Sequence, residues 1–426
     1  MVKVFDAREA DPKEIVGQLR RPGGFLSEKV RAAARRIVAD VREKGDEALL
    51  KYTERFDGVR LERTQVPIEE IEEARNALDR EAEESLRLAI ENVRFFHERE
   101  LDRSFETSLG IGATVGQRIR PIRRAGLYVP GGHAAYPSTL VMAAVPARVA
   151  GVGEIAVCAP PGSDGHVSPH VLAVAGLLGL EEVYRVGGAQ AVGAMAYGTE
   201  SIPPVNKIVG PGNDYVVAAK LEVFGVVGVD APQGPSEVVV IADAGVFPER
   251  VAYDLMAQAE HLSGASAVLL TPSAELVRSV EPLLLGEPAE LVTLVWVQSV
   301  AQAVEITNRY APEHAHVISE DPEAICQDLD AVGMLAIGDF SPVALSDYAA
   351  GPSHALPTGG TAAWASPLGT HDFTARTNYI RYTPEALTNL GPHVERLARL
   401  EGFENHARSV CVRLRKKTLP RRSQDG

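Results

Sequence analysis

Short apolar runs that alternate with helical stretches constrain the fold of this chain more than any other feature. The first series begins at AGLYV (125–129) and recurs at intervals of roughly 20 to 30 residues. Its further members are EIAVCA (154–159), EVYRV (182–186), NKIVG (206–210) and GVVGVD (225–230). This rhythm is typical of βαβ units, because parallel strands must be joined by crossover connections.

A second series of apolar runs follows, again with helical stretches between its members. These runs are EVVVIAD (237–243), SAVLLT (266–271), LVTLVWV (291–297), HAHVIS (314–319) and GMLAIG (333–338). The sequence therefore predicts an α/β protein with two Rossmann-like parallel-sheet domains and helical N-terminal and C-terminal extensions. The expected divisions are an N-terminal arm (1–24), a first domain (25–127 plus 238–380), a second domain (128–237) and a C-terminal tail (381–426).

The first hundred residues are charged and helical in pattern. One helix is expected after Ser27, with Gly45 as its stop and apolar residues at helical spacing between them. Leu86, Ile90 and Val93 predict a second helix. Beyond Tyr382 the pattern is again helical and charged, in a segment too short and polar for a core of its own.

Composition excludes several classes of protein. With 43 Lys and Arg against 57 Asp and Glu, the chain carries a net charge of −14, which argues against a nucleic-acid partner. A short basic run at 413–422 is interpreted as solvated surface. Three widely spaced cysteines indicate a reducing compartment. No apolar run reaches the ~18 residues of a membrane span, so we expect a cytoplasmic protein that binds no membrane.

Two polar motifs could carry chemistry. Gln258 and His261 are three residues apart on an expected helix, so their side chains point the same way and could hold a metal ion. Glu313 and His314 are adjacent, and they offer two titratable groups with different proton affinities. Taken alone, the first motif could equally be an ordinary polar helix face and the second an ordinary loop pair.

The loops that follow the first series of strands are rich in small residues. They are YVPGGHAAYPS after Tyr128, VGGAQAVG after Val186 and VGPGNDYV after Val209. Ligands bind outside the carboxyl ends of parallel strands, and glycine lets the backbone approach a phosphate, so these loops could bind a nucleotide. No GxGxxG fingerprint stands in its proper setting, and the glycines could instead serve tight turns.

Taken together, the motifs resemble those of the histidinol dehydrogenase family over roughly residues 25 to 410. They are YVPGG (128–132), GGAQA (187–191), GPGNDYV (210–216), GPSEV (234–238), QAEH (258–261), YAPEH (310–314), DYAAGPSHALPT (347–358) and EGFENH (401–406). The resemblance implies oxidation of an amino alcohol, histidinol, to histidine in two hydride transfers to NAD. It also implies an enzyme-held aldehyde, one zinc ion per site, and a homodimer whose tails complete the partner's active sites.

The resemblance also implies a role for each matching residue. Glu313 and His314 correspond to the catalytic acid–base pair. The positions that match zinc ligands are Gln258, His261, Asp347 and His406, and those that match NAD contacts are Tyr128, Gln190 and Asn213. Besides His314 and the zinc ligands, the positions that match substrate contacts are Ser236, His354 and Glu401.

The remaining candidate groups are read as structural. Cys158 lies in an apolar strand and is expected to be a buried, inert thiol. The histidines without a matching motif are expected to be surface or structural residues: His97, His133, His166, His170, His316, His371 and His393.

The chain departs from the family pattern at some positions that border the expected pocket. His133 follows YVPGG, Ser346 precedes Asp347, GPSH stands where GPNH is usual, and residues 362–373 are unusual. A related zinc and NAD enzyme that oxidises another small polar alcohol therefore remains an alternative. A zinc hydrolase and a catalytically silent binding protein are further alternatives, against which stand the Gly-rich loops and the Glu313–His314 pair. The sequence leaves open the substrate, the physiological metal and the order of steps.

Overall fold

The computed structural model describes residues 2–20, 26–110, 112–131, 136–231, 233–261 and 264–414. Two compact units are present, and we describe each by itself. Unit 1 comprises Met1–Leu101 and Pro121–Phe373, and unit 2 comprises Asp102–Arg120 and Thr374–Gly426.

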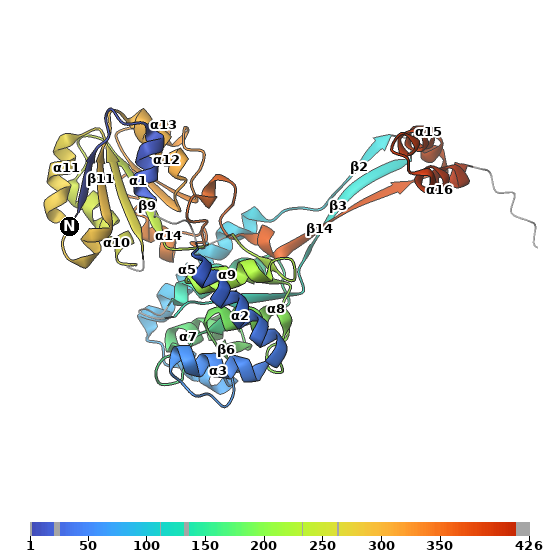
Figure 1. The fold of residues 1–426 in the computed structure, drawn as a ribbon, viewed down its shortest axis with the longest axis horizontal. Coiled ribbons are helices and arrows are strands. Elements are labelled where there is room, and N and C mark those ends of the chain that lie inside the picture. Colours follow the sequence, from blue (N-terminus) through green and yellow to red (C-terminus); the bar gives the residue numbers. More distant parts are fainter. Residues whose placement is uncertain are drawn as a thin grey trace, which may run out of the picture. The chain divides into compact units, whose positions relative to one another are not determined.

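A six-stranded sheet organises one part of unit 1 (Figure 1). Its order is β1 (Lys3–Asp6), β11 (Val292–Trp296), β10 (Ser266–Thr271), β9 (Glu237–Ala242), β12 (His314–Ile318) and β13 (Met334–Ile337), and all neighbours are parallel. Alternate residues of β9 face opposite sides: Val238 and Val240 join one apolar cluster, whereas Val239 and Ile241 join another. This alternation follows from the period of two along a strand and explains why the whole strand is apolar.

Helices cover both faces of this sheet. One face is packed by α10 (Pro248–Ala259) and α11 (Ala274–Val280), and the other by α1 (Pro12–Leu19) and α12 (Val300–Tyr310). Two short helices, α13 (Pro322–Cys326) and α14 (Ala344–Tyr348), follow β12 and β13 in the chain. The chain also forms 3₁₀ turns at Glu281–Leu283, Glu287–Leu291, Thr361–Ala363 and Thr370–Phe373, the last of which packs on helices that cover the second sheet of unit 1.

The second sheet of unit 1 has five parallel strands. Its order is β6 (Val183–Arg185), β5 (Glu154–Ala159), β4 (Arg124–Tyr128), β7 (Lys207–Val209) and β8 (Gly228–Val229). One face is covered by α4 (Ile68–Asn76), α5 (Arg80–Glu100), α6 (Pro137–Val149) and α7 (Pro169–Leu177). The other face is covered by α2 (Glu28–Lys44), α3 (Asp46–Asp57), α8 (Gly188–Tyr197) and α9 (Asp214–Val223).

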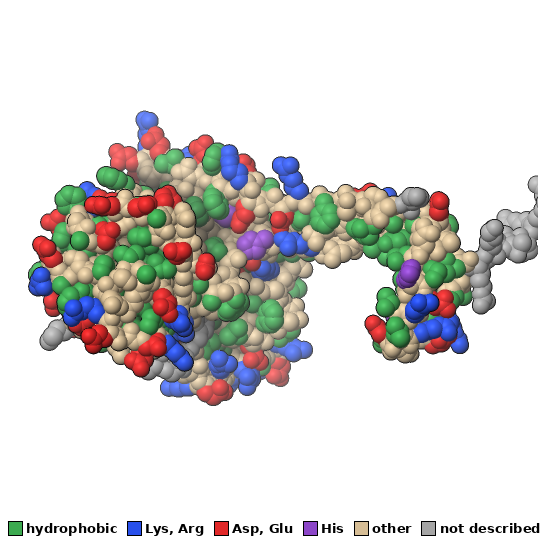
Figure 2. All heavy atoms as spheres, turned by 90° about the horizontal axis from the view of Figure 1, so that it is seen from above, with side chains coloured by type: hydrophobic (Ala, Val, Ile, Leu, Met, Phe, Trp, Pro, Cys, Tyr) green, Lys and Arg blue, Asp and Glu red, His purple; other side chains and the backbone are tan. Residues whose placement is uncertain are grey.

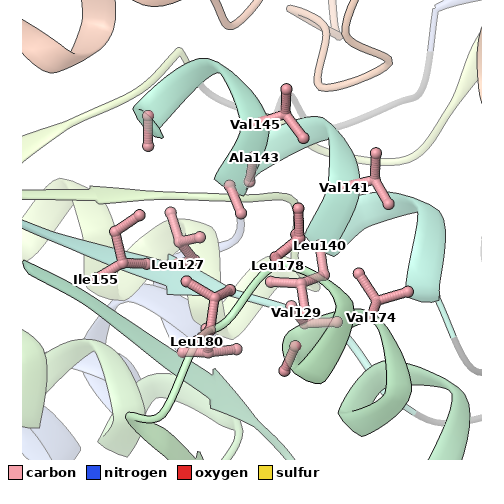
Figure 3. Packing of buried hydrophobic residues seen from close by; sticks show 14 of the residues in the cluster. Leu127, Val129, Leu140, Val141, Ala143, Val145, Ile155, Val174, Leu178 and Leu180 are labelled. Carbon is pink, nitrogen blue, oxygen red and sulfur yellow. The ribbon is translucent and has the colours of Figure 1, made fainter. Parts of the chain in front are cut away.

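Figure 3 shows how the first of these faces is filled. Leu127 and Ile155 on the strands face Leu140 and Val174 on the helices, with Leu180 beside them. All five side chains are buried. At about 1.5–3 kcal/mol for each large apolar side chain removed from water, such clusters supply most of the stability that holds the sheet and its helices together.

The predicted α/β fold class and both series of strands are confirmed. The helix expected after Ser27 is α2, in which the Ser27 hydroxyl accepts a hydrogen bond from Val30 N–H and Gly45 is the C-cap. The helix expected around Ile90 is α5.

The packing groups some segments differently from the predicted divisions. Helices α2 to α5 cover the five-stranded sheet, whereas the predicted first domain joins residues 25–127 to residues 238–380. Residues 3–6, expected as part of an arm, pair with β11 as an edge strand. The apolar stripe of a helix shows that this face will be buried, but not against which sheet. The edge strand β1 is mostly exposed, so it has no apolar run that would mark it as a strand.

Unit 2 contains a three-stranded sheet that the sequence did not predict. Its order is β14 (Thr374–Tyr382), β3 (Ala113–Pro121) and β2 (Phe105–Gly110), and β2 and β3 are antiparallel. Two helices, α15 (Pro384–Leu400) and α16 (Glu404–Leu414), pack on each other, and Gly391 allows Leu414 to approach closely. The helices expected beyond Tyr382 are therefore present.

The surface in Figure 2 carries acidic and basic side chains interspersed with one another over unit 1. Within the described part of the chain, no helix is long and apolar enough to cross a membrane.

Candidate functional site

A cavity of about 810 Å³ in unit 1 gathers most of the residues predicted to bind substrate or move protons. Its lining includes Ser236, His261, Glu313, His314, Asp347 and His354. Several of these groups lie at the amino ends of strands: Ser236 directly precedes β9, and His314 is the first residue of β12. Because β9 and β12 are parallel neighbours, with His314 opposite Val238, the amino ends of both strands open on the same edge of the sheet.

Glu313 is a buried carboxyl with a defined hydrogen bond. Its side chain is 7% exposed, and Oε2 accepts from the backbone N–H of Glu237 at 2.8 Å. Burial raises the pKa of Glu313 to about 7, while the charge of His314 and the Glu237 N–H oppose this rise. A carboxyl with this pKa exchanges protons near neutral pH, as a general acid or base must.

His314 lies between two carboxylates. Its Nδ1 is 3.7 Å from Glu313 Oε2, and its Nε2 is 3.5 Å from Asp347 Oδ1. Burial alone would lower the pKa of His314, but the charges of Glu313 and Asp347 outweigh burial and raise it. Neither ring nitrogen makes a close hydrogen bond within the described residues, so both are available to a ligand.

His354 is held in one orientation by two neighbours. Its Nδ1 is 2.7 Å from the backbone oxygen of Asp347, to which it donates, and its Nε2 is 3.2 Å from Thr139 Oγ1. Burial lowers the pKa of His354, which favours the neutral ring. Nε2 is then an acceptor, and the Thr139 hydroxyl can donate to it. Thr139 was not predicted as a site residue, since a threonine in a small-residue helix carries no sequence signal.

The predicted zinc ligands are divided between the units. Gln258 and His261 lie at the end of α10 and just beyond it. Burial alone would raise the pKa of Asp347, but the contact with His314 and, to a smaller extent, the charge of His261 lower it. The Gln258 side chain is buried, and its Nε2 has no partner among the described residues, so no hydrogen bond from Nε2 holds the amide away from a metal. An amide oxygen, a carboxylate and an imidazole suit zinc. Among the described residues, no group of three or more His, Cys, Asp or Glu could hold a metal ion.

The fourth predicted ligand, His406, belongs to unit 2, as does Glu401. Glu401 is the C-cap of α15, and His406 is in the first turn of α16, with its ring against Phe403. Both side chains are exposed.

A second cavity in unit 1, of about 990 Å³, contains the residues predicted to contact NAD. Tyr128, Gln190 and Asn213 all line it, from the end of β4, the first turn of α8 and the N-cap of α9. The Tyr128 hydroxyl accepts from Gly188 N–H at 3.0 Å, and burial raises the pKa of Tyr128 to about 12. The carboxyl ends of the five-stranded sheet thus form this cavity, as expected for the Gly-rich loops.

The two cavities adjoin. Pro130, Gly131, Asn213 and Tyr215 line both of them. A ligand in one cavity can therefore reach a ligand in the other.

Three of the residues expected to be structural are buried: Cys158, His97 and His316. Cys158 is fully buried, and burial raises the pKa of its thiol to about 12, so the thiol is inert as predicted. His97 is buried beside Glu100 at 2.6 Å, and His316 bridges Asp254 and the Gly338 carbonyl. The departure noted at His133 lies outside the described residues.

Comparison with known proteins gives the family. The family model for histidinol dehydrogenase matches residues 23–414, nearly the whole chain. The chain belongs to the histidinol dehydrogenase family. It is 44% identical to a histidinol dehydrogenase of Geobacillus kaustophilus and 43% identical to one of Bacillus subtilis, in each case over 93% of this chain and 97% or 96% of the relative.

A solved structure agrees. Histidinol dehydrogenase from Elizabethkingia anophelis superposes with a TM-score of 0.91 at 32% identity, over 97% of this chain and 98% of that one. The protein is therefore an oxidoreductase of histidine biosynthesis that acts on histidinol.

Proposed function

We propose that this member of the histidinol dehydrogenase family converts L-histidinol to L-histidine through L-histidinal, with two NAD molecules and one zinc ion per site. The observation that carries the proposal is the adjoining pair of cavities. One holds the proton-transferring groups Glu313 and His314, and the other is formed by Gly-rich loops at the carboxyl ends of strands. Hydride transfer requires a donor and an acceptor in contact, and the shared lining allows this.

We assign the metal to Gln258, His261 and Asp347 of unit 1 with His406 of unit 2. The donor types fit zinc, and the Gln258 amide has no other partner for its Nε2. When bound, zinc would orient the substrate's imidazole and amino nitrogens, and NAD would accept the hydrides.

The proton transfers fall to Glu313 and His314. His314 accepts the alcohol proton in the first oxidation, because it is buried in the substrate cavity with both ring nitrogens available. Glu313, with a pKa of about 7, removes a proton from the water that adds to the aldehyde before the second oxidation. His354, Ser236 and Glu401 are assigned to substrate binding, and Tyr128, Gln190 and Asn213 to NAD.

We further propose a homodimer in which unit 2 completes the partner's active site, in the cytoplasm. Unit 2 is small and exposes large apolar side chains, among them Ile380 at 75% and Leu400 at 77%. Surfaces of this kind mark contacts with another protein chain. The three cysteines are free thiols, in agreement with a reducing compartment.

The test is an assay with L-histidinol, NAD and zinc. The proposal expects two reduced nicotinamides per histidine formed. Reduction of NAD in the presence of another small polar alcohol, but not in the presence of histidinol, would favour the related dehydrogenase instead. Metal-dependent hydrolysis without NAD would favour a hydrolase, and binding without turnover would favour a silent protein.

A further inference from the structure

Asp57 presents a carboxylate in the cavity assigned to NAD. It is the last residue of α3 and is followed by Gly58 with φ 73°, a left-handed cap that ends the helix there. Its side chain lines the cavity together with Tyr128 and Gln190. Burial raises the pKa of Tyr128, and the charge of Asp57 adds to this rise.

The hydrogen-bonding capacity of this carboxylate is not satisfied by the protein. Asp57 Oδ2 is buried and has no partner within the described residues, and Gln190 Oε1 nearby is in the same condition. Gln190 is 1% exposed, so solvent water does not supply the hydrogen bond that its Oε1 lacks. Buried acceptors left without donors are costly, and they persist where a ligand supplies the donors.

Another acid in the same cavity differs in this respect. Asp164 also lines the cavity, but its Oδ1 accepts from His166 N–H at 3.0 Å, within its own turn. Lys29, Arg36 and Arg55 line the cavity too and can meet the charges of a diphosphate. Asp57 therefore differs from Asp164, because its Oδ2 accepts no hydrogen bond from the described residues.

We propose that Asp57 accepts a hydrogen bond from the adenosine ribose 2′-hydroxyl of the cofactor, and that its charge makes the enzyme select NAD over the 2′-phosphorylated NADP. The proposal rests on the proposed use of a nicotinamide dinucleotide. A vicinal diol offers the donors that the carboxylate lacks, whereas a 2′-phosphate would place a second negative charge against it.

The experiment measures binding of NADH and NADPH separately, by nicotinamide fluorescence, to the full-length protein and two variants. We expect the unmodified protein to bind NADH at least about tenfold more tightly than NADPH, as a hydrogen bond to a charged group allows. Asp57→Asn should weaken NADH binding about tenfold and leave NADPH binding unchanged or tighter, so that the preference disappears. The matched control Asp164→Asn should keep the preference.

The outcomes separate the two proposals. If the unmodified protein prefers NADH and Asp57→Asn keeps that preference, the role of Asp57 is refuted while the proposed function stands. If the unmodified protein binds neither dinucleotide, the proposed function fails and the role of Asp57 with it. Thermal melting of each variant without cofactor shows whether the fold is intact. If a folded Asp57→Asn variant binds neither NADH nor NADPH, Asp57 contributes to binding of both cofactors and its proposed role in selecting NAD is refuted.

Discussion

Breaking the buried ion pair between Lys220 and Asp230 should destabilise unit 1 strongly. Both side chains are almost inaccessible, at 5% and 1% exposure. Lys220 Nζ donates to the Gly210 carbonyl at 2.8 Å, and Asp230 Oδ2 accepts from the Gly210 N–H at 2.7 Å. The pair therefore holds both backbone groups of Gly210, whose φ of 118° no other residue type adopts readily.

The perturbation is Lys220→Met, which keeps the length of the side chain but leaves Asp230 buried without a counter-charge. Removing one partner of a buried pair costs about 3–5 kcal/mol. Since a domain has about 5–15 kcal/mol of stability in total, the loss should be plain in urea unfolding followed by circular dichroism. The double variant Lys220→Met/Asp230→Asn should recover part of it, because the buried charge is gone while an acceptor remains for Gly210 N–H.

An exposed pair provides the control. Lys44 lies 3.3 Å from Asp40 on the surface of α2, and Lys44→Met should cost less than about 1 kcal/mol. A Lys220→Met variant as stable as Lys44→Met would refute the reasoning. Since Gly210 leads into the loop that ends at Asn213, Lys220→Met should also weaken NADH binding, and Lys44→Met should not.

Further predictions concern chemistry, assembly and pH. Glu313→Gln should slow the conversion of aldehyde to acid far more than the reduction of aldehyde, whereas His314→Asn should slow both oxidations. Each loss should be a factor of ~10² to 10⁴. Equal losses in every half-reaction for both variants would contradict the separate roles of Glu313 and His314. Chelation should abolish turnover but keep the circular dichroism spectrum, and full activity without metal would exclude the zinc assignment. Mixing inactive His314→Asn and His406→Asn chains should restore activity if sites are shared between subunits; continued inactivity after verified subunit exchange would place the tail on its own subunit. Burial raises the pKa of Asp57 from 3.8 to about 6, so its ionised form destabilises the fold as pH rises through that range. Asp57→Asn should therefore raise the free energy of unfolding by about 1 kcal/mol at pH 8, after a discount for the partial exposure of Asp57, and should leave it unchanged at pH 4. An equal effect at both pH values would show that the buried charge of Asp57 is not the cause.

The local elements were predictable because their signals are local. Helix α2 could be bounded from Ser27 and Gly45, since capping depends on residues within one turn. The buried strands were visible as apolar runs for the same reason. The strands of unit 2 were not visible, because all residues of β2 are exposed and the segment has no apolar pattern. What makes β2 a strand is its antiparallel pairing with β3, which follows it closely in the chain.

The candidate site divides in the same way. The motifs identified Glu313, His314 and Asp347 as residue types able to move protons or bind a metal, and this depends on side-chain chemistry alone. The sequence could not show that His314 lies between Glu313 and Asp347, because Asp347 reaches it only through the folding of β13 and α14. Nor could it show that burial raises the pKa of Glu313, since burial is a property of packed elements.

The sequence by itself determined the two series of parallel strands, the helices between them, the chemistry of the motifs and the family. Only the tertiary structure decided that the two cavities use opposite ends of their sheets: the carboxyl ends of β4 and its neighbours, and the amino ends of β9 and β12. Strand order and direction follow from long-range hydrogen bonding, which no local pattern encodes. That arrangement brings Asn213 to the border of both cavities, and so links cofactor and substrate.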